Sequence, residues 1–455
     1  MRFVRRMMSL LETRSISGRV SLILGFGLAL GCDRYHPAEP IGAAGASGAA
    51  GASTAGDGGA AGSGGAGSDA GAGGVSGVGG SPGQGGTGGT SAPPPAPEEC
   101  PDDGSDTADL TLAGLGFSVP VDAGTPELDA GDAGDAGDAA DAGTLDGATP
   151  SVQLPGLVGW ASVAGLGTAI TLGGAAGRVV TARTAAELQT YASSAEPLVI
   201  RVCGTIRAPA VQVSSNKTLV GVGSQATLEG GLRIRGTADI NVRDVVVKNL
   251  RVNGAYSAVD GAAIQIHAAH HVWLDHNELW DSVDGLVQVV HGSDFVSVSW
   301  TKFHFTQDTP DKEHRFACLI GHSDDAEARA EDEGHLRVTL HHNWWAEYIR
   351  QRAPRVRFGD VHLFENYWSS AGNDYSIWAA LGSRLLLENN YFESVNNPHE
   401  LHDPDAQILA TGNRYEEGVT GVIASTSSAF TPPYAYGLGP VDDVPAQVAA
   451  GAGRQ

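Results

Sequence analysis

The sequence predicts an all-β protein, a parallel β-helix that follows a long disordered tether. Three observations lead to this prediction. Short β-branched stretches, broken by Gly, Asn and Asp, run from about residue 151 to 425. Asparagines followed by aromatic residues recur there about every 23 positions. The chain before residue 150 is dominated by Gly, Ala, Ser and Asp, which cannot form a packed core.

Residues 1–31 have the pattern of an export signal. Five arginines precede a twelve-residue apolar run, Val20 to Gly31, which is too short to span a bilayer. The run ends in Leu28-Ala29-Leu30-Gly31-Cys32, which resembles the lipobox of bacterial lipoproteins. We expect Cys32 to be lipidated and to anchor a secreted protein to the cell envelope. The alternative is an ordinary signal peptide with an incidental cysteine and a freely extracellular protein.

Residues 32–150 read as a disordered linker. Within 33–150, one basic residue accompanies eighteen acidic ones, and the repeat Asp129-Ala-Gly-Asp132-Ala-Gly-Asp135 adds like charges that repel. The repeat lacks the glycine pairs and nonapeptide period of known calcium-binding repeats, so we disfavour calcium binding there. The net charge of the whole chain, −24, argues against a nucleic-acid partner.

The segment 151–425 has the strand pattern of one β-domain. Helical periodicity is confined to residues 185–195, and residues 426–455, with Pro432 and Pro433, suggest a loose C-terminal tail. Eight stretches read as strands: 199–202, 217–220, 245–247, 272–274, 296–300, 336–340, 361–364 and 385–387.

The asparagine repeat gives the architecture. Asn343, Asn366, Asn390 and Asn413 are 23, 24 and 23 residues apart, and Asn277 lies 66 residues before Asn343, which we interpret as three further periods. A propeller blade needs roughly 40 residues, so this period favours stacked coils about 4.8 Å apart. Recurring asparagines would form a ladder of amide hydrogen bonds at one turn. We therefore assign them to structure and not to a catalytic site.

The four cysteines are too few and too scattered for a disulfide framework. A bridge between Cys203 and Cys318 stays open at this point. The adjacent histidine pairs, 270–271 and 341–342, have no clear ligand spacing, and we interpret them as structural or surface groups.

Several motifs over residues 157–415 resemble the pectate lyase family of right-handed, single-stranded parallel β-helices. They occur in the family's order, and together they are specific where each alone would be weak. The motifs are Val202–Ile206, Ser215–Gly221, Val272-Trp273-Leu274-Asp275-His276, Asp284-Gly285-Leu286, Val298-Ser299-Trp300, Leu319-Ile320-Gly321-His322-Ser323 and Arg352-Ala353-Pro354-Arg355-Val356-Arg357.

The resemblance implies β-elimination on polygalacturonate, the acidic backbone of pectin. Members use one arginine to take the C5 proton and a second, five positions on, to bind the substrate carboxylate; these positions fall on Arg352 and Arg357. Because a guanidinium is almost always protonated, the base must be assisted by neighbouring cations or act transiently. Regular strand alternation would point the two side chains to opposite faces, so we expect a bend near Pro354.

The resemblance also implies Ca²⁺, but two of four expected carboxylates are absent. The ligand positions read Asp260 followed by Ala262, and Asp284 followed by Gln288, so Asp260, Asp284 and Gln288 are the predicted metal ligands. The family's site lysine is replaced by Phe316. Arg315 is the predicted substrate-binding substitute, and Lys312 is the other basic residue nearby.

Three functions remain open on the sequence. The first, which we favour, is a monomeric, membrane-tethered pectate lyase with a weakened calcium requirement. The second is a calcium-independent lyase acting on methyl-esterified pectin, whose α-proton is more acidic. The third is a non-catalytic uronate-binding β-helix of the cell surface.

Overall fold

The computed structural model describes residues 156–455, except 238–240, 258–260, 310 and the side chain of Ser224. The signal peptide, Cys32, the linker and the ligand position Asp260 lie outside these residues. None of the described helices is long and apolar enough to cross a lipid bilayer.

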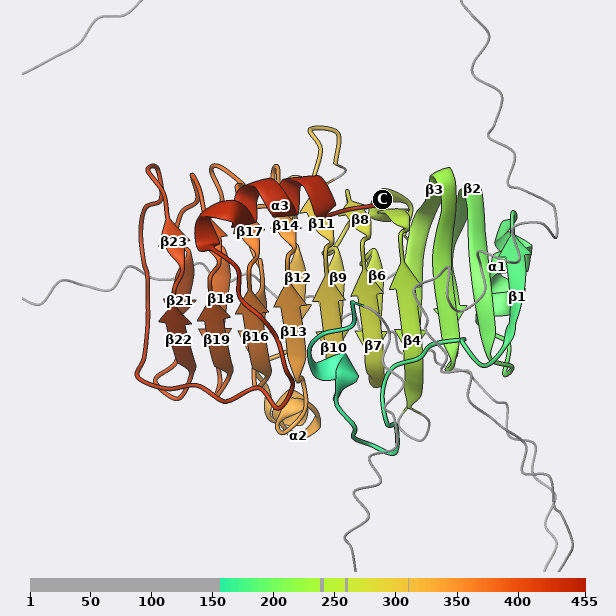
Figure 1. Cartoon of the computed structure of the whole chain (residues 1–455), viewed down its shortest axis with the longest axis horizontal. Helices are drawn as coiled ribbons and strands as arrows, with labels where there is room; N and C mark the ends of the chain where they lie inside the picture. The colour runs from blue at the N-terminus through green and yellow to red at the C-terminus, as the bar shows by residue number, and fades with distance from the viewer. Residues whose placement is uncertain (1–155, 238–240, 258–260, 310) are drawn as a thin grey trace, which may run out of the picture. The chain divides into compact units, whose positions relative to one another are not determined.

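The described strands are all parallel and form one coiled sheet with three faces (Figure 1). The first face contains β4 (Val242–Lys248), β7 (Ala269–Asp275), β10 (Asp294–Ser299), β13 (Val338–His341), β16 (Asp360–Phe364), β19 (Arg384–Glu388) and β22 (Gln407–Thr411). The second contains β5 (Arg251–Asn253), β8 (Glu278–Trp280), β11 (Lys302–His304), β14 (Trp344–Trp345), β17 (Tyr367–Trp368), β20 (Tyr391–Phe392) and β23 (Arg414–Tyr415). The third contains β6 (Ile264–His267), β9 (Val287–Val290), β12 (Cys318–Ile320), β15 (Arg355–Arg357), β18 (Ile377–Ala380) and β21 (His399–Leu401). The predicted parallel β-helix is therefore confirmed.

The N-terminal end of the solenoid is made of longer strands. β2 (Leu198–Val213) pairs with β3 (Lys217–Arg235), and β3 pairs in turn with β4, β5 and β6, so a single strand bends around all three faces. β1 (Arg178–Ala182) is the edge strand. Helix α1 (Ala185–Ala192), where helical periodicity was predicted, packs against β1 and β2 with a Thr184–Glu187 capping box and protects this edge.

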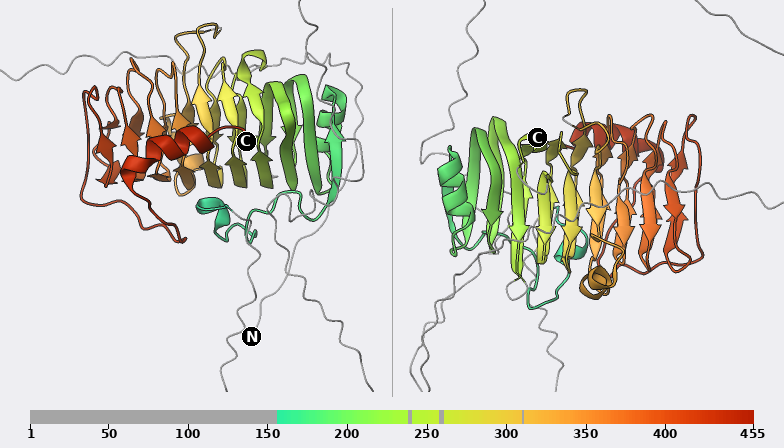
Figure 2. Two further views of the ribbon diagram at one scale, coloured as in Figure 1. Left: turned by 45° about the horizontal axis from the view of Figure 1, so that its top comes forward. Right: turned by 180° about the vertical axis from the view of Figure 1, so that it is seen from behind.

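The remaining helices lie outside the coils. They are η1 (Trp160–Ser162), η2 (Gly254–Tyr256), α2 (Ala326–Asp332), η3 (Val441–Asp443) and α3 (Val444–Gly451). Figure 2 shows α3 lying along the outside of the solenoid, where it contacts β17. Tyr434 also binds this body, since its hydroxyl is 2.7 Å from Thr339 Oγ1 and 2.9 Å from His362 Nδ1. Residues 426–455 thus pack on the coils rather than forming the loose tail that we expected.

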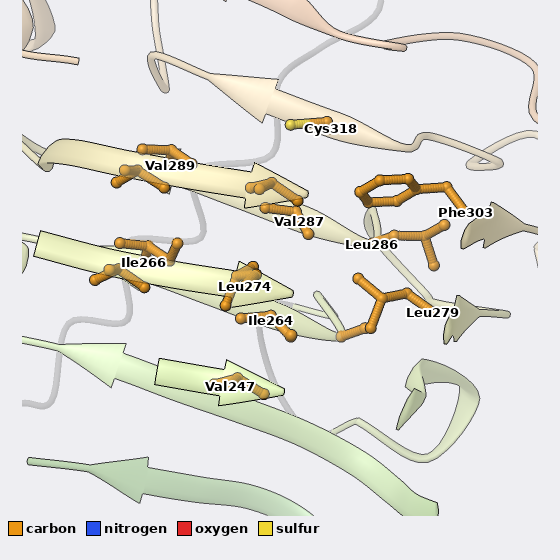
Figure 3. Close-up of a cluster of buried hydrophobic side chains, with 14 of the residues drawn as sticks. Val247, Ile264, Ile266, Leu274, Leu279, Leu286, Val287, Val289, Phe303 and Cys318 are labelled. Carbon is orange, nitrogen blue, oxygen red and sulfur yellow. The ribbon is translucent and has the colours of Figure 1, made fainter. Parts of the chain in front are cut away.

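The core fills the inside of the coil with aliphatic side chains that stack from one turn to the next (Figure 3). Val247 and Leu274 come from the first face, Leu279 and Phe303 from the second, and Ile264 from the third; each is fully buried. Because each residue packs on its equivalents in neighbouring coils, burial stabilises the stack at about 25 cal/mol per Å² of apolar surface.

The asparagine ladder is present at the turn before the second face. Asn343 Nδ2 donates to Asn366 Oδ1 at 3.0 Å, Asn366 to Asn390 at 3.0 Å, and Asn390 to Asn413 at 2.9 Å. The following aromatics, Trp345, Trp368, Phe392 and Tyr415, stack inside the coil.

The predicted count of coils between Asn277 and Asn343 was wrong. Strand register places Glu278 opposite Lys302, and Lys302 opposite Trp344, so two coils separate the asparagines and not three. Thr301 occupies the ladder position in the intermediate coil, where its backbone N–H donates to Asn343 Oδ1. The extra length is the excursion that carries α2.

The cysteines resolve the open disulfide question. Cys318 is free and buried, and burial raises the pKa of its thiol. Cys203 is disulfide-bonded, so the Cys203–Cys318 bridge is excluded.

Candidate active site

The outer surface of the third face carries a row of side chains in register across successive coils. Inward positions such as Ile264 and Val356 are fully buried, so their neighbours point outward. The row, which we call the outer row, runs from β3 to β21 through Arg233, Gln265, Gln288, Leu319, Arg355, Trp378 and Glu400. Sequence-distant residues are thereby placed about 4.8 Å apart.

Arg352 lies at the start of this surface with its side chain mostly buried. Its guanidinium carbon is 4.0 Å from the centroid of the Phe316 ring, and only 8% of the residue is exposed. Its Nε is buried and has no hydrogen-bond partner within the described part of the chain. The backbone of Arg352 is left-handed, with φ of 61°, and a turn separates it from β15. The bend predicted between Arg352 and Arg357 is therefore present.

Arg357 is anchored at the other end of β15. Its Nε donates to Asp324 and its Nη1 donates to the Gly321 carbonyl at 3.0 Å, and the residue is 1% exposed. Gly321 is needed here, because its φ is 83° and an added Cβ would lie 2.9 Å from Arg357 Cβ. The Leu-Ile-Gly motif thus shapes the site of the second arginine.

Tyr375 and Trp378 complete the arginine cluster, and neither was singled out by the sequence. The guanidinium carbon of Arg355 lies 4.3 Å from the Trp378 ring centroid. Burial raises the pKa of Tyr375, and the positive charges of Arg355, Arg352 and Arg357 oppose that rise. The tyrosine thus lies within electrostatic reach of all three guanidinium groups.

Arg350 does not belong to this cluster, although it is close in sequence. It pairs with Glu313 and, at 2.7 Å, with Asp374. Its charge is therefore balanced by two carboxylates before any ligand arrives.

Two described positions predicted for calcium lie together on the third face. Gln288 Nε2 donates to the Asp284 carbonyl at 3.0 Å, and Gln288 Oε1 accepts from Gln265 Nε2 at 3.1 Å. Gln265 Oε1 is buried and has no hydrogen-bond partner in the described structure. Calcium takes six to eight oxygen ligands. One carboxylate and one unpaired amide oxygen do not by themselves fit a resident calcium ion.

A buried arginine lies where the family has one of the lost carboxylates. Arg233, 3% exposed, donates to the Ala262 carbonyl at 3.0 Å and to Ser257 Oγ at 2.6 Å. This contact could not be predicted from the sequence, since 29 residues separate Arg233 from Ala262. The backbone of Ala262, where the family has an aspartate, is thus contacted by a buried cation.

The missing lysine is not replaced by a cation that touches Arg352. Phe316 occupies the position and packs on the Arg352 guanidinium. Arg315, the predicted substitute, lies 5.1 Å from the Tyr348 ring centroid and donates to the Thr306 carbonyl at 3.0 Å. Lys312 is exposed.

This arrangement can bind an anionic chain and neutralise its carboxylates. Arginines 352, 355 and 357 provide three guanidinium groups around one short strand, and Trp378 provides a flat apolar surface beside them. Asp324 pairs with Arg357 and balances part of this charge. A cluster of guanidinium groups of this kind is suited to a uronate polymer.

Comparisons with known proteins show which family the chain resembles. The pectate lyase family profile matches residues 127–449. Pectate lyase plyB of Emericella nidulans is 36% identical over 253 residues, which cover 54% of this chain and 70% of that protein. The pectate trisaccharide-lyase of Thermotoga sp. is 32% identical over 322 residues, which cover 62% of this chain and 84% of the relative.

A solved structure of the same fold gives a further match. The pectate lyase Bsp165PelA from Bacillus sp. N165, solved in complex with trigalacturonate, is 27% identical with a TM-score of 0.54. The match covers 66% of this chain and 98% of that one. Fold, motifs and relatives all lead to one assignment: the chain belongs to the pectate lyase family.

Proposed function

We propose that this polysaccharide lyase cleaves polygalacturonate by β-elimination at the arginine cluster of the third face. The observation that carries the proposal is the placement of Arg352, Arg355 and Arg357 along and just before one strand of the third face, with Arg352 Nε left without a described partner. The substrate class is supported by the relatives, which are named pectate lyases, and by the trigalacturonate complex of a structural neighbour.

The chemistry requires positive charge before it requires a base. The C5 proton lies α to an anionic carboxylate, so its removal builds a second negative charge, which nearby cations stabilise. Arg357, held by Asp324 and the Gly321 carbonyl, is the residue that would pair with that carboxylate. Arg352, in its neutral guanidine form, takes the C5 proton, the released electron pair forms the C4–C5 double bond, and the C4–O bond breaks. Water protonates the leaving oxygen, and the hydroxide left behind takes the proton from Arg352, which restores the neutral base.

The environment of Arg352 both helps and hinders this role. Arg355 and Arg357 disfavour another positive charge nearby, whereas the Phe316 ring stabilises the charged guanidinium by a cation–π contact. A lysine in place of Phe316 would, like Arg355 and Arg357, disfavour the positive charge on Arg352. We infer that proton removal is slower here than in members that retain the lysine.

The experiment is an assay of unsaturated product from polygalacturonate and from highly methylated pectin, each with and without a chelator. Product from polygalacturonate supports the proposal. Product from methylated pectin alone would establish the esterified-pectin lyase, and binding without product would establish the non-catalytic reading; either would overturn the proposal. Loss of polygalacturonate activity in chelator that CaCl₂ restores and ZnCl₂ does not would show that calcium supplies some of the charge; its predicted ligands are Asp260, Asp284 and Gln288.

We also propose that the enzyme is a secreted monomer anchored through Cys32. A tether of 118 residues at roughly 5 to 6 Å times the square root of its length reaches about 60 Å. Expression with a labelled fatty acid should label the wild type and not Cys32→Ser, which should appear in the medium. Equal labelling of both would contradict the anchor.

A further inference from the structure

Three imidazole rings stack in a column at one border of the third face. His267 ends β6, His291 follows β9 and His322 follows Gly321 after β12, so the three come from successive coils. Ring centroids are 4.0 Å apart for His267 and His291, and 3.8 Å apart for His291 and His322. None of these residues takes part in the proposed elimination.

Helix α2 brings a carboxylate to this column. Glu331 Oε2 is 2.7 Å from His291 Nδ1 and 3.9 Å from His322 Nε2. One donor atom from each residue lies within 4.8 Å of the other two, and no other such group of three His, Cys, Asp or Glu donors occurs in the described structure. The side chains of His291, His322 and Glu331 are 33%, 22% and 41% exposed, so the donors are open to solvent.

A second, buried carboxylate fixes the orientation of one ring. Asp332 is fully buried, and its Oδ2 is 3.0 Å from His322 Nδ1 while its Oδ1 accepts from the backbone N–H of Gly292 at 2.7 Å. This contact engages Nδ1 and leaves Nε2 on the side of Glu331. Histidine ligands of metals usually have such a carboxylate on the other ring nitrogen.

We infer that His291, His322 and Glu331 form a binding site for a divalent metal ion of the Zn²⁺ class. Two imidazoles and one carboxylate suit zinc, whereas calcium prefers a shell made of oxygens. Donors about 2.0 to 2.1 Å from a tetrahedral zinc ion are about 3.4 Å apart. The observed separations from Glu331 Oε2, 2.7 Å and 3.9 Å, bracket that value. The His291 and His322 rings are stacked at 18°, so one of them must turn before both nitrogens face the same ion.

The proposed ion would join the α2 excursion to two coils. His322 follows Gly321, whose carbonyl accepts from Arg357, and Asp324, which also pairs with Arg357, precedes α2. A metal at this place would therefore hold the segment that anchors the second arginine. The site is separate from the calcium positions on β9, and its occupancy can be measured without any lyase activity.

The test is calorimetric titration of the chelator-treated, dialysed protein with ZnCl₂. We expect one Zn²⁺ per chain, at least tenfold weaker binding in Glu331→Gln, and no binding in the double variant His291→Ala/His322→Ala. The matched control is His402→Gln, because His402 pairs with Glu400 at 3.0 Å and has no third donor among the described residues. The control should bind zinc as the wild type does, and a large excess of CaCl₂ should not displace the ion.

Two results would overturn the site. One is the absence of zinc binding by the wild type, and the other is unchanged binding by the double variant. Thermal unfolding in chelator shows whether each variant is folded. If the double variant unfolds, Glu331→Gln becomes the deciding variant, because the side chain of Glu331 is exposed. Zinc affinity equal to that of the wild type in Glu331→Gln would refute the inference.

Discussion

The two arginines at the ends of the Arg352–Arg357 motif are held in different ways. Arg357 is held by a carboxylate and a carbonyl, whereas Arg352 rests on an aromatic ring and keeps a buried Nε without a described partner. An anchored guanidinium suits the binding of a carboxylate, and an unanchored one suits proton transfer. This asymmetry supports the roles that the family resemblance implies.

Arg352→Ala should therefore lower kcat on polygalacturonate by about a hundredfold or more, which is the usual cost of losing a general base. Arg350→Ala is the matched control, since that side chain is only two residues away but is paired with Glu313 and Asp374. We expect the control to stay within a few-fold of wild type. Turnover of Arg352→Ala equal to that of the control would remove Arg352 from the mechanism.

Phe316→Lys should raise kcat by about tenfold, equivalent to about 1.4 kcal/mol of barrier. The change removes the ring that stabilises the charged Arg352 guanidinium and adds a cation beside it. Phe316→Leu removes the ring without adding charge and should give a smaller gain. Initial rates of unsaturated product at one fixed pH compare the three proteins; a slower, fully folded Phe316→Lys would contradict the argument.

Each amide of the asparagine ladder makes several hydrogen bonds to the neighbouring coils. Asn366 accepts from the backbone and side chain of Asn343 and donates to Asn390 and to the Leu340 carbonyl, with no exposed surface. Removing one amide leaves buried partners unpaired on both sides. The loss in the free energy of unfolding should depend on where the removed amide lies along the ladder.

Asn366→Ala should lower the free energy of unfolding by about 3 kcal/mol or more, since each buried group left unpaired costs about 1 to 3 kcal/mol. Asn413→Ala removes the last amide, which is half-buried, so water can replace part of what is lost. We expect a smaller loss there. Urea unfolding measures both variants, and equal losses would show that the ladder is not cooperative.

The strands that the sequence predicted share one property. The last six stretches, from 245–247 to 385–387, all lie in strands of the first face, whose members are four to seven residues long. The second face was missed because its strands have only two or three residues, too few to show alternation. Helix α2 was missed for the same reason, since seven residues rich in charge and alanine show little helical periodicity.

The candidate site was predictable where it is local and not where it crosses coils. Motif spacing identifies the two arginines, Arg352 and Arg357, and the replaced family residues at positions 262, 288 and 316. Tyr375 reaches the arginines from the next coil, and Arg233 reaches Ala262 from the previous one. Contacts between coils depend on the length of every intervening turn, as the error at Asn277 shows. No single sequence reveals those lengths.

The whole molecule contains histidines that are buried in their neutral form. Burial lowers the pKa of His270 to about 4 and that of His399 to about 4, against 6.5 for an ordinary histidine. The folded state therefore binds fewer protons than the unfolded state between these values. Their contribution to stability is complete above pH 6.5 and is lost as the pH falls towards 4.

The free energy of unfolding should thus fall by up to about 3 kcal/mol for each of these histidines when the pH drops from about 7 to about 4. Urea unfolding at several pH values measures the slope. His399→Gln should flatten it, whereas His402→Gln, at an exposed site, should leave it unchanged. A wild-type curve that is flat over this interval would refute the assignment.

The register of the third face determines how many positions along the solenoid a bound polymer can contact. A linear polymer lying across the strands meets one new row of side chains for each coil, in increments of about 4.8 Å. The proposed reactive arginines lie at β15, and coils on both sides of β15 offer further positions for the polymer. Duplicating a coil beyond β18 would lengthen the third face on one side of β15 alone. The size of the fragments released would then change, while the elimination at β15 stayed the same.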